Sequence, residues 1–533
     1  MVNKEDKLYI AHTDYEGEGN KALILEPKMA NRHGLIAGAT GTGKTVSLQV
    51  LAESFSDLGV PCFMADMKGD LSGIYKAGVL TKFIEKREAK FGVKFEFQPY
   101  PVQFFDVYGE QGTPLRVTVR NFGVTLFSRV MSLTDTQEGV LNAVFRIADK
   151  EGFVLDTLED LRVLLNRVGQ KAKDYQTEYG NITTASIGAI QRNLLLLEDQ
   201  GGDKFFGYPE FDVKDLIGLE KVNDRKKGIV NILAADKLYN NPRLYSAFLM
   251  WLLTSIYNTM PEVGDLDKPK FIFFFDEAHL LFDDASKSLL EQIEKIVRLI
   301  RSKGVGVYFI TQNPMDIPED VLGQLGNKIQ HALRAFTPKD QKSVKAVADS
   351  FRKNDSFDTQ AALMELETGE ALVSFLDEKG SPRSVERAKM LCPQGQIGPI
   401  TAEERAKAIQ ESVVEKKYRE AVNRPSATEK IAEEKEKAEA AMAEQNNAAD
   451  EAKTAKEKAA EEKKRQKEEA ASKKEEQRQA KEREKQEKEE AKLKAQRSKQ
   501  RSQIFSKIIS FFAPILRKFL TEFIAGSSKT RKR

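Results

Sequence analysis

An α/β fold built on a parallel sheet is predicted by three features of the sequence. A glycine-rich turn at 38–45 stands between an apolar strand and a segment with helical spacing. Further apolar strands follow, and several of them end in carboxylate or amide side chains. Strands that alternate with helices and end in polar residues are typical of parallel sheets. After about residue 400 the composition changes to Ala, Glu, Lys, Arg and Gln, which predicts a charged extension behind the α/β core.

The segment before the turn, residues 1–34, contains two short strand patterns, KLYIAH and KALILEP. It lacks the apolar stretch of a secretory signal, and the chain has no run of about 18 apolar residues that would predict a spanning helix. The 533 residues include only two cysteines and four histidines, without the spacing of a disulfide framework or a zinc site. We therefore predict a cytoplasmic protein whose metal is Mg²⁺.

The turn itself, GATGTGKT, fits the pattern Gly-x-x-x-x-Gly-Lys-[Ser/Thr] of a phosphate-binding loop. Glycines allow successive backbone N–H groups to surround an anion. Lys44 is expected to reach the β- and γ-phosphates, and the Thr45 hydroxyl to hold Mg²⁺. The strand at 35–37 and the helix at 46–55 supply the context that such a loop needs. The predicted nucleotide-binding residues are Gly38, Ala39, Thr40, Gly41, Thr42, Gly43, Lys44 and Thr45.

A second strand follows the loop helix, in GVPCFMADMKGD, and it ends at Asp66, Lys68 and Asp70. From about 80 to 225 the pattern is mainly helical, as in TQEGVLNAVFRIAD and ASIGAIQRNLLLLED. Strand patterns return in KGIVNILAAD, KFIFFFDEAH, GVGVYFITQNP, KIQHALRAF and GEALVSFLD. We therefore predict one α/β core over 35–400 that carries a mainly helical insertion at about 80–225.

The strand FIFFF ends at Asp276 and Glu277. In a phosphate-loop enzyme, a carboxylate in the place of Asp276 completes the Mg²⁺ shell. Glu277 suits a general base that polarises the attacking water, and this second carboxylate favours hydrolysis coupled to movement over a simple kinase. Gln312 ends the strand YFIT and should lie beside the nucleotide, because parallel sheets gather ligands at this edge. It is either a sensor of the γ-phosphate or a capping amide.

Two arginines precede the glutamine-bearing strand, Arg298 and Arg301 in LLEQIEKIVRLIRSKGVG. An arginine held at a subunit edge can stabilise the phosphoryl-transfer charge on a neighbour's nucleotide. Arginines on an amphipathic helix are also often merely solvated. Position alone leaves both interpretations open.

Together, GATGTGKT, FFFDEAH, RSKGVGVYFITQNP and HALRAF resemble the HerA–FtsK superfamily of RecA-like motor ATPases. MADMKGDLSG and TDTQEGVLNAVFRIAD look like segments of its bacterial HerA-like ATPase family, and the resemblance covers about residues 5 to 400. The resemblance implies a RecA-like P-loop NTPase core, with ATP and Mg²⁺ as its cofactors and ATP hydrolysis as its activity. It also implies a homo-oligomer, usually a hexameric ring.

The resemblance assigns roles to individual arginines as well. Arg301 matches the arginine that reaches the neighbouring subunit's ATP, and Arg334 in HALRAF is the alternative for this role. Arg32 stands twelve residues before the loop lysine, where a second arginine of relatives contacts phosphate. HerA-type DNA translocases carry a full β-barrel domain ahead of the loop, whereas we expect only a few strands in 1–34.

The charged region at 401–500 is predicted to be a spacer, either helical or disordered. Opposite charges often fall three or four residues apart, which supports a helix, but apolar a and d positions for a coiled coil are essentially missing. Residues 501–533 predict an amphipathic helix and a basic tail. The apolar face of this helix consists of Ile504, Ile508, Phe512, Leu516, Phe519 and Phe523. Such a face marks a docking surface. It could dock on the core of the same protein, on a protein partner or on the membrane surface, and we favour docking on protein, own core or partner, over the membrane.

The leading functional hypothesis is Mg-dependent ATP hydrolysis by a ring-forming motor that acts on DNA, as a translocase or helicase-like protein. The alternative is an ATPase that remodels or translocates proteins, with the membrane surface as one location. A third hypothesis is a nucleotide-dependent scaffold with slow turnover. Basic residues of the core are interspersed with acidic ones, so the sequence does not choose between DNA and protein.

Overall fold

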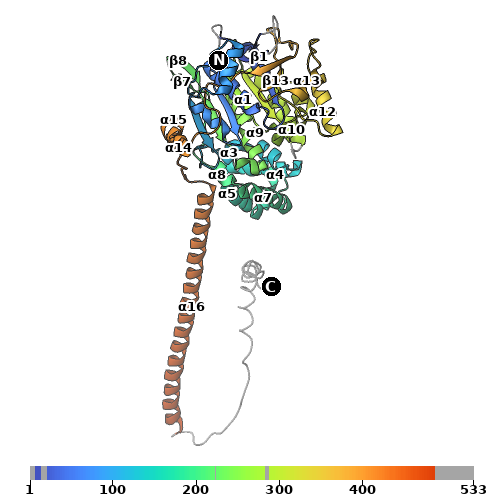
Figure 1. Ribbon diagram of the computed structural model, residues 1–533. Coiled ribbons are helices and arrows are strands. Elements are labelled where there is room, and N and C mark those ends of the chain that lie inside the picture. The colour runs from blue at the N-terminus through green and yellow to red at the C-terminus, as the bar shows by residue number, and fades with distance from the viewer. Residues whose placement is uncertain (1–5, 14–20, 223, 283–286, 487–533) are drawn as a thin grey trace. The chain divides into compact units, whose positions relative to one another are not determined.

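The computed structural model describes residues 6–13, 21–222, 224–282 and 287–486. The chain divides into two compact units, Met1–Lys437 and Ala438–Arg533. The first unit contains a twisted sheet with helices on both faces (Figure 1). The predicted amphipathic helix at 501–533 lies outside the described residues.

A twelve-stranded sheet forms the centre of the first unit, in the order β2-β1-β14-β13-β12-β3-β11-β10-β4-β9-β5-β6. From β12 to β6 every neighbouring pair is parallel, and β13, β14, β1 and β2 continue the sheet as antiparallel strands. The strand bounds are β1 (Leu8–Thr13), β2 (Ala22–Leu25), β3 (Gly34–Ala37), β4 (Cys62–Asp66), β5 (Val102–Asp106), β6 (Thr113–Pro114), β9 (Val230–Ala234), β10 (Phe271–Phe275), β11 (Val305–Thr311), β12 (Asn327–Gln330), β13 (Glu370–Ser374) and β14 (Glu386–Met390). The predicted α/β fold class with a parallel sheet is confirmed.

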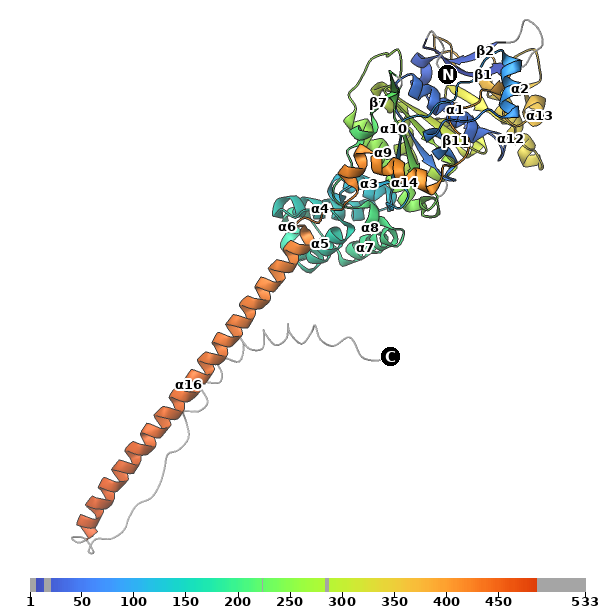
Figure 2. The same cartoon turned by 60° about the vertical axis from the view of Figure 1, so that its left-hand side comes forward.

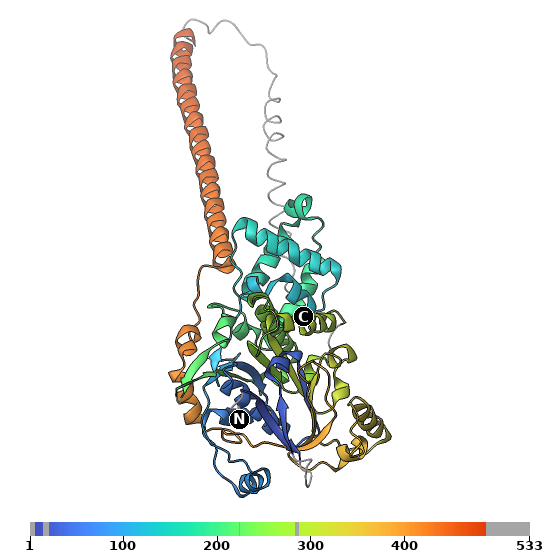
Figure 3. The same ribbon diagram turned by 90° about the horizontal axis from the view of Figure 1, so that it is seen from above.

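Helices cover both faces of this sheet (Figure 3). The described α-helices are α1 (Lys44–Asp57), α2 (Lys82–Phe91), α3 (Val119–Val130), α4 (Asp135–Glu151), α5 (Leu158–Gln170), α6 (Ala172–Tyr179), α7 (Thr184–Asp199), α8 (Gly202–Phe205), α9 (Pro242–Thr259), α10 (Lys287–Ile300), α11 (Glu319–Leu322), α12 (Pro338–Asp349), α13 (Thr359–Glu365), α14 (Ala402–Glu411), α15 (Val413–Tyr418) and α16 (Ala427–Gln486). A separate hairpin consists of β7 (Leu219–Val222) and β8 (Arg225–Gly228).

Strand β10 illustrates why the central strands have continuous apolar sequences. Successive side chains of a strand point to opposite faces. Phe273 and Phe275 belong to the core cluster that contains α9 and α10, whereas Ile272 and Phe274 belong to the cluster that contains α1. A strand buried on both faces therefore shows no alternation of polar and apolar residues. The two carboxylates, Asp276 and Glu277, come directly after the strand.

The helical insertion differs from its predicted limits of about 80–225. Strands β5 and β6 fall inside that range but belong to the main sheet, where β5 pairs with β9 through Val102 and Val230. The helices α3 to α8 form a helical lobe (Figure 2) that shares one core cluster with α9 and the sheet, and Phe122, Phe127 and Phe206 are in mutual ring contact. Residues 1–34 likewise contribute β1 and β2 to the main sheet rather than forming a separate domain.

The charged region is helical where the structure describes it. Helix α16 has 60 residues, and its side chains form i,i+4 ion pairs such as Glu433–Lys437 and Arg465–Glu469. Its described residues beyond Lys437 are exposed. An exposed helix without an apolar stripe agrees with the helical form of the predicted spacer.

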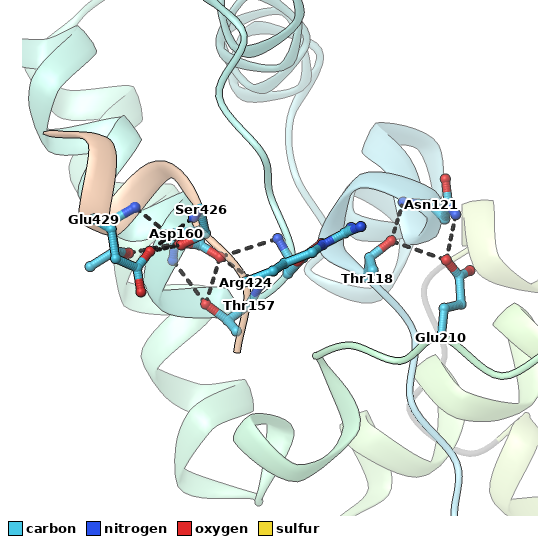
Figure 4. Close-up of polar contacts among 10 residues, drawn as sticks. Thr118, Asn121, Thr157, Asp160, Glu210, Arg424, Ser426 and Glu429 are labelled. Carbon is cyan, nitrogen blue, oxygen red and sulfur yellow. Dashed lines mark hydrogen bonds and ion pairs between the residues drawn. The ribbon is translucent and has the colours of Figure 1, made fainter. Parts of the chain in front are cut away.

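Residues 419–437 comprise the connection to α16 and the first turns of that helix. They contact the helical lobe, and we call them the strap (Figure 4). The Arg424 guanidinium donates two hydrogen bonds to the Asp156 carboxylate, at 2.6 and 2.8 Å. The Asp160 carboxylate accepts from the hydroxyls of Ser426 at 2.5 Å and Thr428 at 2.7 Å. Asp160 also caps its own helix, since it accepts from the Thr157 amide at 2.9 Å. Sequence reasoning placed all of this strap in the solvated spacer.

We expect Asp160→Ala to lower the free energy of unfolding by about 2–4 kcal/mol, because the buried donors that now meet this carboxylate would lose their acceptor. Asp160 is only 1% exposed. Denaturant unfolding measures the change, and hydrogen exchange should show lost protection in α5 and at 426–437. Asp174→Ala, on the exposed side of α6, serves as the control. Equal stability of the two variants would contradict this role of Asp160.

Candidate nucleotide site

The loop that connects β3 to α1 has the backbone conformation that the motif predicts. Gly38 and Gly43 have φ values of 150° and 112°, which side chains rarely adopt. A Cβ atom at Gly38 would lie 2.5 Å from the Cβ of His331, so this glycine also allows the close approach of β12. The loop then enters α1, whose first two residues are Lys44 and Thr45. The helix N-terminus therefore faces the loop, as a phosphate site requires.

The Lys44 side chain folds back over the loop. Its ammonium donates to the carbonyl oxygens of Gly38 at 2.7 Å and Ala39 at 3.1 Å. The Thr42 hydroxyl donates to the same Ala39 oxygen at 2.7 Å. Burial lowers the pKa of Lys44, and the nearby carboxylates of Glu277 and Asp276 oppose this shift. The loop therefore holds a cation beside two carboxylates.

Those carboxylates follow β10, which is separated from the loop strand β3 only by β11. Burial raises the pKa of Asp276 to about 7, and the adjacent Glu277 adds to this shift. The Glu277 backbone lies in the left-handed region, with a φ of 46°, and its amide donates to Asp276 Oδ1 at 2.9 Å. A non-glycine residue in this region is strained, and such strain gathers at functional sites.

A divalent cation would offset the electrostatic repulsion between the carboxylates of Asp276 and Glu277. The Thr45 hydroxyl and the Asp276 carboxylate are hard oxygen ligands of the kind that Mg²⁺ takes. Mg²⁺ keeps several waters and completes its shell with substrate phosphates. The donor set at this edge therefore fits Mg²⁺ bound together with a nucleotide.

Gln312 lies between the loop and the acidic pair, at the end of β11. Its amide nitrogen is 3.4 and 3.5 Å from the two oxygens of the Glu277 carboxylate. Among the described residues, this side chain makes no hydrogen bond to the end of its own strand. The capping alternative therefore has no supporting contact. Gln312 thus joins Lys44, Asp276 and Glu277 at one edge of the sheet.

The sequence analysis did not identify His331, which contacts the residues on both sides of the loop, Ala37 before it and Ser47 after it. This side chain is fully buried, and its Nδ1–H donates to the Glu370 carbonyl at 2.8 Å. Its Nε2 accepts from the Ser47 hydroxyl of α1 at 2.9 Å. Burial lowers the pKa of His331 to about 4, so the ring is neutral at pH 7. The signal was a polar residue directly after β12, the same pattern that identified Gln312.

The predicted arginines occupy different edges of the sheet. Arg301 precedes β11 and Arg32 precedes β3, so both lie at the edge opposite the phosphate loop. Burial lowers the pKa of Arg301, and the positive charge of the Arg32 guanidinium adds to this shift. The seven residues of β11 span about 23 Å at 3.3 Å per residue. Arg334 instead follows β12 at the loop edge and donates to the Met364 carbonyl at 3.1 Å.

Comparison with known proteins places this site in a family. The family described as helicase HerA-like C-terminal matches residues 12–513, which is nearly the whole chain. The chain belongs to the HerA-like helicase family. The resemblance noted in the motifs is therefore confirmed at the level of this family.

Individual HerA relatives are distant. The chain is 23% identical over 353 residues to the DNA double-strand break repair helicase HerA of Sulfurisphaera tokodaii, a match that covers 64% of this chain and 62% of the relative. The protein of the same name from Saccharolobus solfataricus is 25% identical over 352 residues, with 64% and 61% coverage. The HerA-like chain thus spans less than two thirds of the length of these relatives.

Solved structures with a similar fold are also remote from this HerA-like chain. Plasmid coupling protein TrwB in complex with the non-hydrolysable GTP analogue GDPNP has a TM-score of 0.48 at 16% identity, covering 71% of this chain and 90% of TrwB. VirB4 of Thermoanaerobacter pseudethanolicus has a TM-score of 0.44 at 14% identity, with coverage of 72% and 96%. The family assignment therefore stands on the match over residues 12–513.

The predicted residues of the HerA-like chain now form two groups. The phosphate loop, Asp276, Glu277 and Gln312 lie at the carboxyl edge of the parallel strands. Arg32 and Arg301 lie at the amino edge. Within the described ranges, no helix is both long and apolar enough to span a bilayer.

Proposed function

We propose that this HerA-like protein hydrolyses ATP with Mg²⁺ as the subunit of a ring-forming motor that moves along DNA. One observation supports the proposal: the phosphate loop and the predicted carboxylates lie at one edge of the sheet, and Arg32 and Arg301 lie at the other. An arginine at the amino edge lies a whole strand length from its own phosphate loop. The same arginine is available to the nucleotide of a neighbouring subunit in a closed ring.

In the proposed site, Lys44 neutralises charge on the β- and γ-phosphates. Thr45 and Asp276 would hold Mg²⁺, which supplies further charge neutralisation when bound. Glu277 accepts the proton of the attacking water. Gln312 either orients the Glu277 carboxylate or senses the γ-phosphate. Arg301, with Arg32 beside it, is the proposed trans-acting group, since Arg334 is at the loop edge of its own subunit.

DNA is the proposed substrate because the named relatives are DNA double-strand break repair helicases. A hexameric ring, a cytoplasmic location, and a protein partner or membrane surface for the 501–533 segment stay predictions of the sequence. The sequence placed the boundary between motor and spacer at 400/401, but buried residues such as Ile409, Val414 and Tyr418 belong to the core of the first unit. The motor is therefore proposed to extend to Lys437, and the exposed part of α16 to be the spacer.

We expect wild-type protein to hydrolyse ATP in the presence of Mg²⁺, to lose turnover in EDTA, and to be stimulated several-fold by duplex DNA. Phosphate release measured with duplex DNA, single-stranded DNA, protein fractions and no addition tests this. Lys44→Ala, which removes the phosphate-binding cation, is the negative control. Absence of Lys44-dependent hydrolysis would overturn the enzyme assignment. Stimulation by a protein fraction alone, with DNA inert, would replace DNA by protein as the substrate.

A further inference from the structure

The loop after β4, residues 67–71, is hydrogen-bonded to the last residue of that strand and lies near the acidic pair. The Asp66 carboxylate accepts from the backbone amides of Lys68 at 3.3 Å, Gly69 at 2.8 Å and Leu71 at 3.0 Å. Asp66 is only 3% exposed, and burial raises its pKa to about 6. Gly69 takes a φ of 77°, a left-handed conformation that favours glycine. The backbone that carries Lys68 is therefore held in place by a buried carboxylate.

This loop brings Lys68 to the neighbouring strand's acidic pair. Strand β4 is adjacent to β10, and both run in the same direction, so their ends meet at one edge. The Lys68 ammonium lies 4.0 Å from Glu277 Oε1, and the Lys68 side chain is 58% exposed. The same ammonium acts electrostatically on Asp276 and Lys44. Lys68 is thus a second lysine of the site, supplied by a different strand from Lys44.

Among the described residues, the other side-chain contacts of the Glu277 carboxylate are longer than an ordinary hydrogen bond. Gln312 Nε2 lies 3.4 and 3.5 Å away, and His279 Nδ1 lies 3.5 Å from Oε2. Hydrogen bonds with nitrogen donors are strongest near 2.9 Å, so these contacts orient the carboxylate weakly, whereas the charge of an ammonium still attracts it at 4.0 Å. The side of Oε1 that faces β4 has Lys68 as its cation.

We propose that Lys68 is a positioning residue for ATP hydrolysis, whose ammonium holds the Glu277 carboxylate in the orientation that reaches the attacking water. The inference rests on the proposed function and adds to it a group that acts through the base. An ion pair as exposed as this one contributes little to folding, so removal of the charge should leave the fold intact. Its effect should appear in catalysis, where a small misplacement of a reacting group lowers the rate steeply.

The test compares Lys68→Met, Lys68→Arg and a matched control, Lys76→Met. Lys76 belongs to the same chain segment, is similarly exposed and pairs with Glu404 at 2.6 Å away from the acidic pair. We expect Lys68→Met to lower kcat by about tenfold to a hundredfold with little change in the KM for ATP. Lys68→Arg should recover most of the rate, and Lys76→Met should behave as wild type. Nucleotide affinity and thermal unfolding, measured on each variant, exclude a general loss of structure.

A double-mutant cycle with Glu277→Gln identifies the route of the effect. If Lys68 acts through Glu277, Lys68→Met adds no further loss in single-turnover rate on the Glu277→Gln background, since coupled residues are non-additive. An equal loss on both backgrounds, a raised KM, or wild-type turnover in Lys68→Met would each overturn the inference while leaving ATP hydrolysis by the wild type in place. A wild type without Lys44-dependent hydrolysis would instead overturn the proposed function, and this inference with it.

Discussion

Glu277→Gln is expected to lower ATP turnover by about two orders of magnitude or more while ATP binding stays nearly unchanged. Glutamine has almost the same shape as glutamate but cannot accept a proton from water. The Lys44 contacts with Gly38 and Ala39 do not involve Glu277, so the phosphate cradle should survive the change. The left-handed backbone at residue 277 is equally accessible to glutamine, which argues for an intact fold.

Steady-state phosphate release measures turnover, and equilibrium binding of a fluorescent ATP analogue measures affinity. A matched control is Glu291→Gln, an exposed glutamate on α10 whose partner Lys287 lies at 4.0 Å. This variant should hydrolyse ATP at the wild-type rate. Wild-type turnover in Glu277→Gln would remove Glu277 from the role of general base, and loss of ATP binding would show that it supports the loop instead.

Arg301→Ala is expected to lose about 10³-fold or more in turnover while it still binds ATP, because an arginine supplied from a neighbour stabilises the charge on the transferred phosphoryl group. Arg301 lies at the edge of the sheet opposite its own loop, so this loss should arise between subunits. Mixing Arg301→Ala with Lys44→Ala tests that directly. A site that combines Lys44 of one subunit with Arg301 of the next is intact, and the mixture should recover activity that neither variant has alone.

Two further variants sharpen the mixing experiment. Arg298→Ala removes an exposed arginine from α10, three residues before Arg301, and should retain wild-type turnover. Arg334→Ala tests the alternative arginine at the loop edge. Recovery in mixtures of Arg334→Ala with Lys44→Ala, and none with Arg301→Ala in verified mixed oligomers, would assign the trans role to Arg334 and a structural role to Arg301.

Local features of the chain were within reach of sequence reasoning. The loop at 38–45, the carboxylates after FIFFF and the glutamine after YFIT are each defined by spacing within one strand and its turn. Parallel strands share a common carboxyl edge, so the sequence alone places these three local patterns together. The fold class followed from the same alternation of strands and helices.

Other features depend on which strands become neighbours, and the tertiary structure alone decided them. Residues 102–106 were assigned to a helical insertion, yet they pair with β9 in the main sheet. Lys68 reaches Glu277 only because β4 lies beside β10, and His331 supports the loop only because β12 lies beside β3. The charged composition of the strap predicts exposure to solvent, but Arg424, Ser426 and Thr428 bind buried carboxylates on α5 and the preceding turn. Spacing along the chain determines which groups a strand end carries, whereas contacts between distant segments depend on strand order, for which local residue patterns carry no signal.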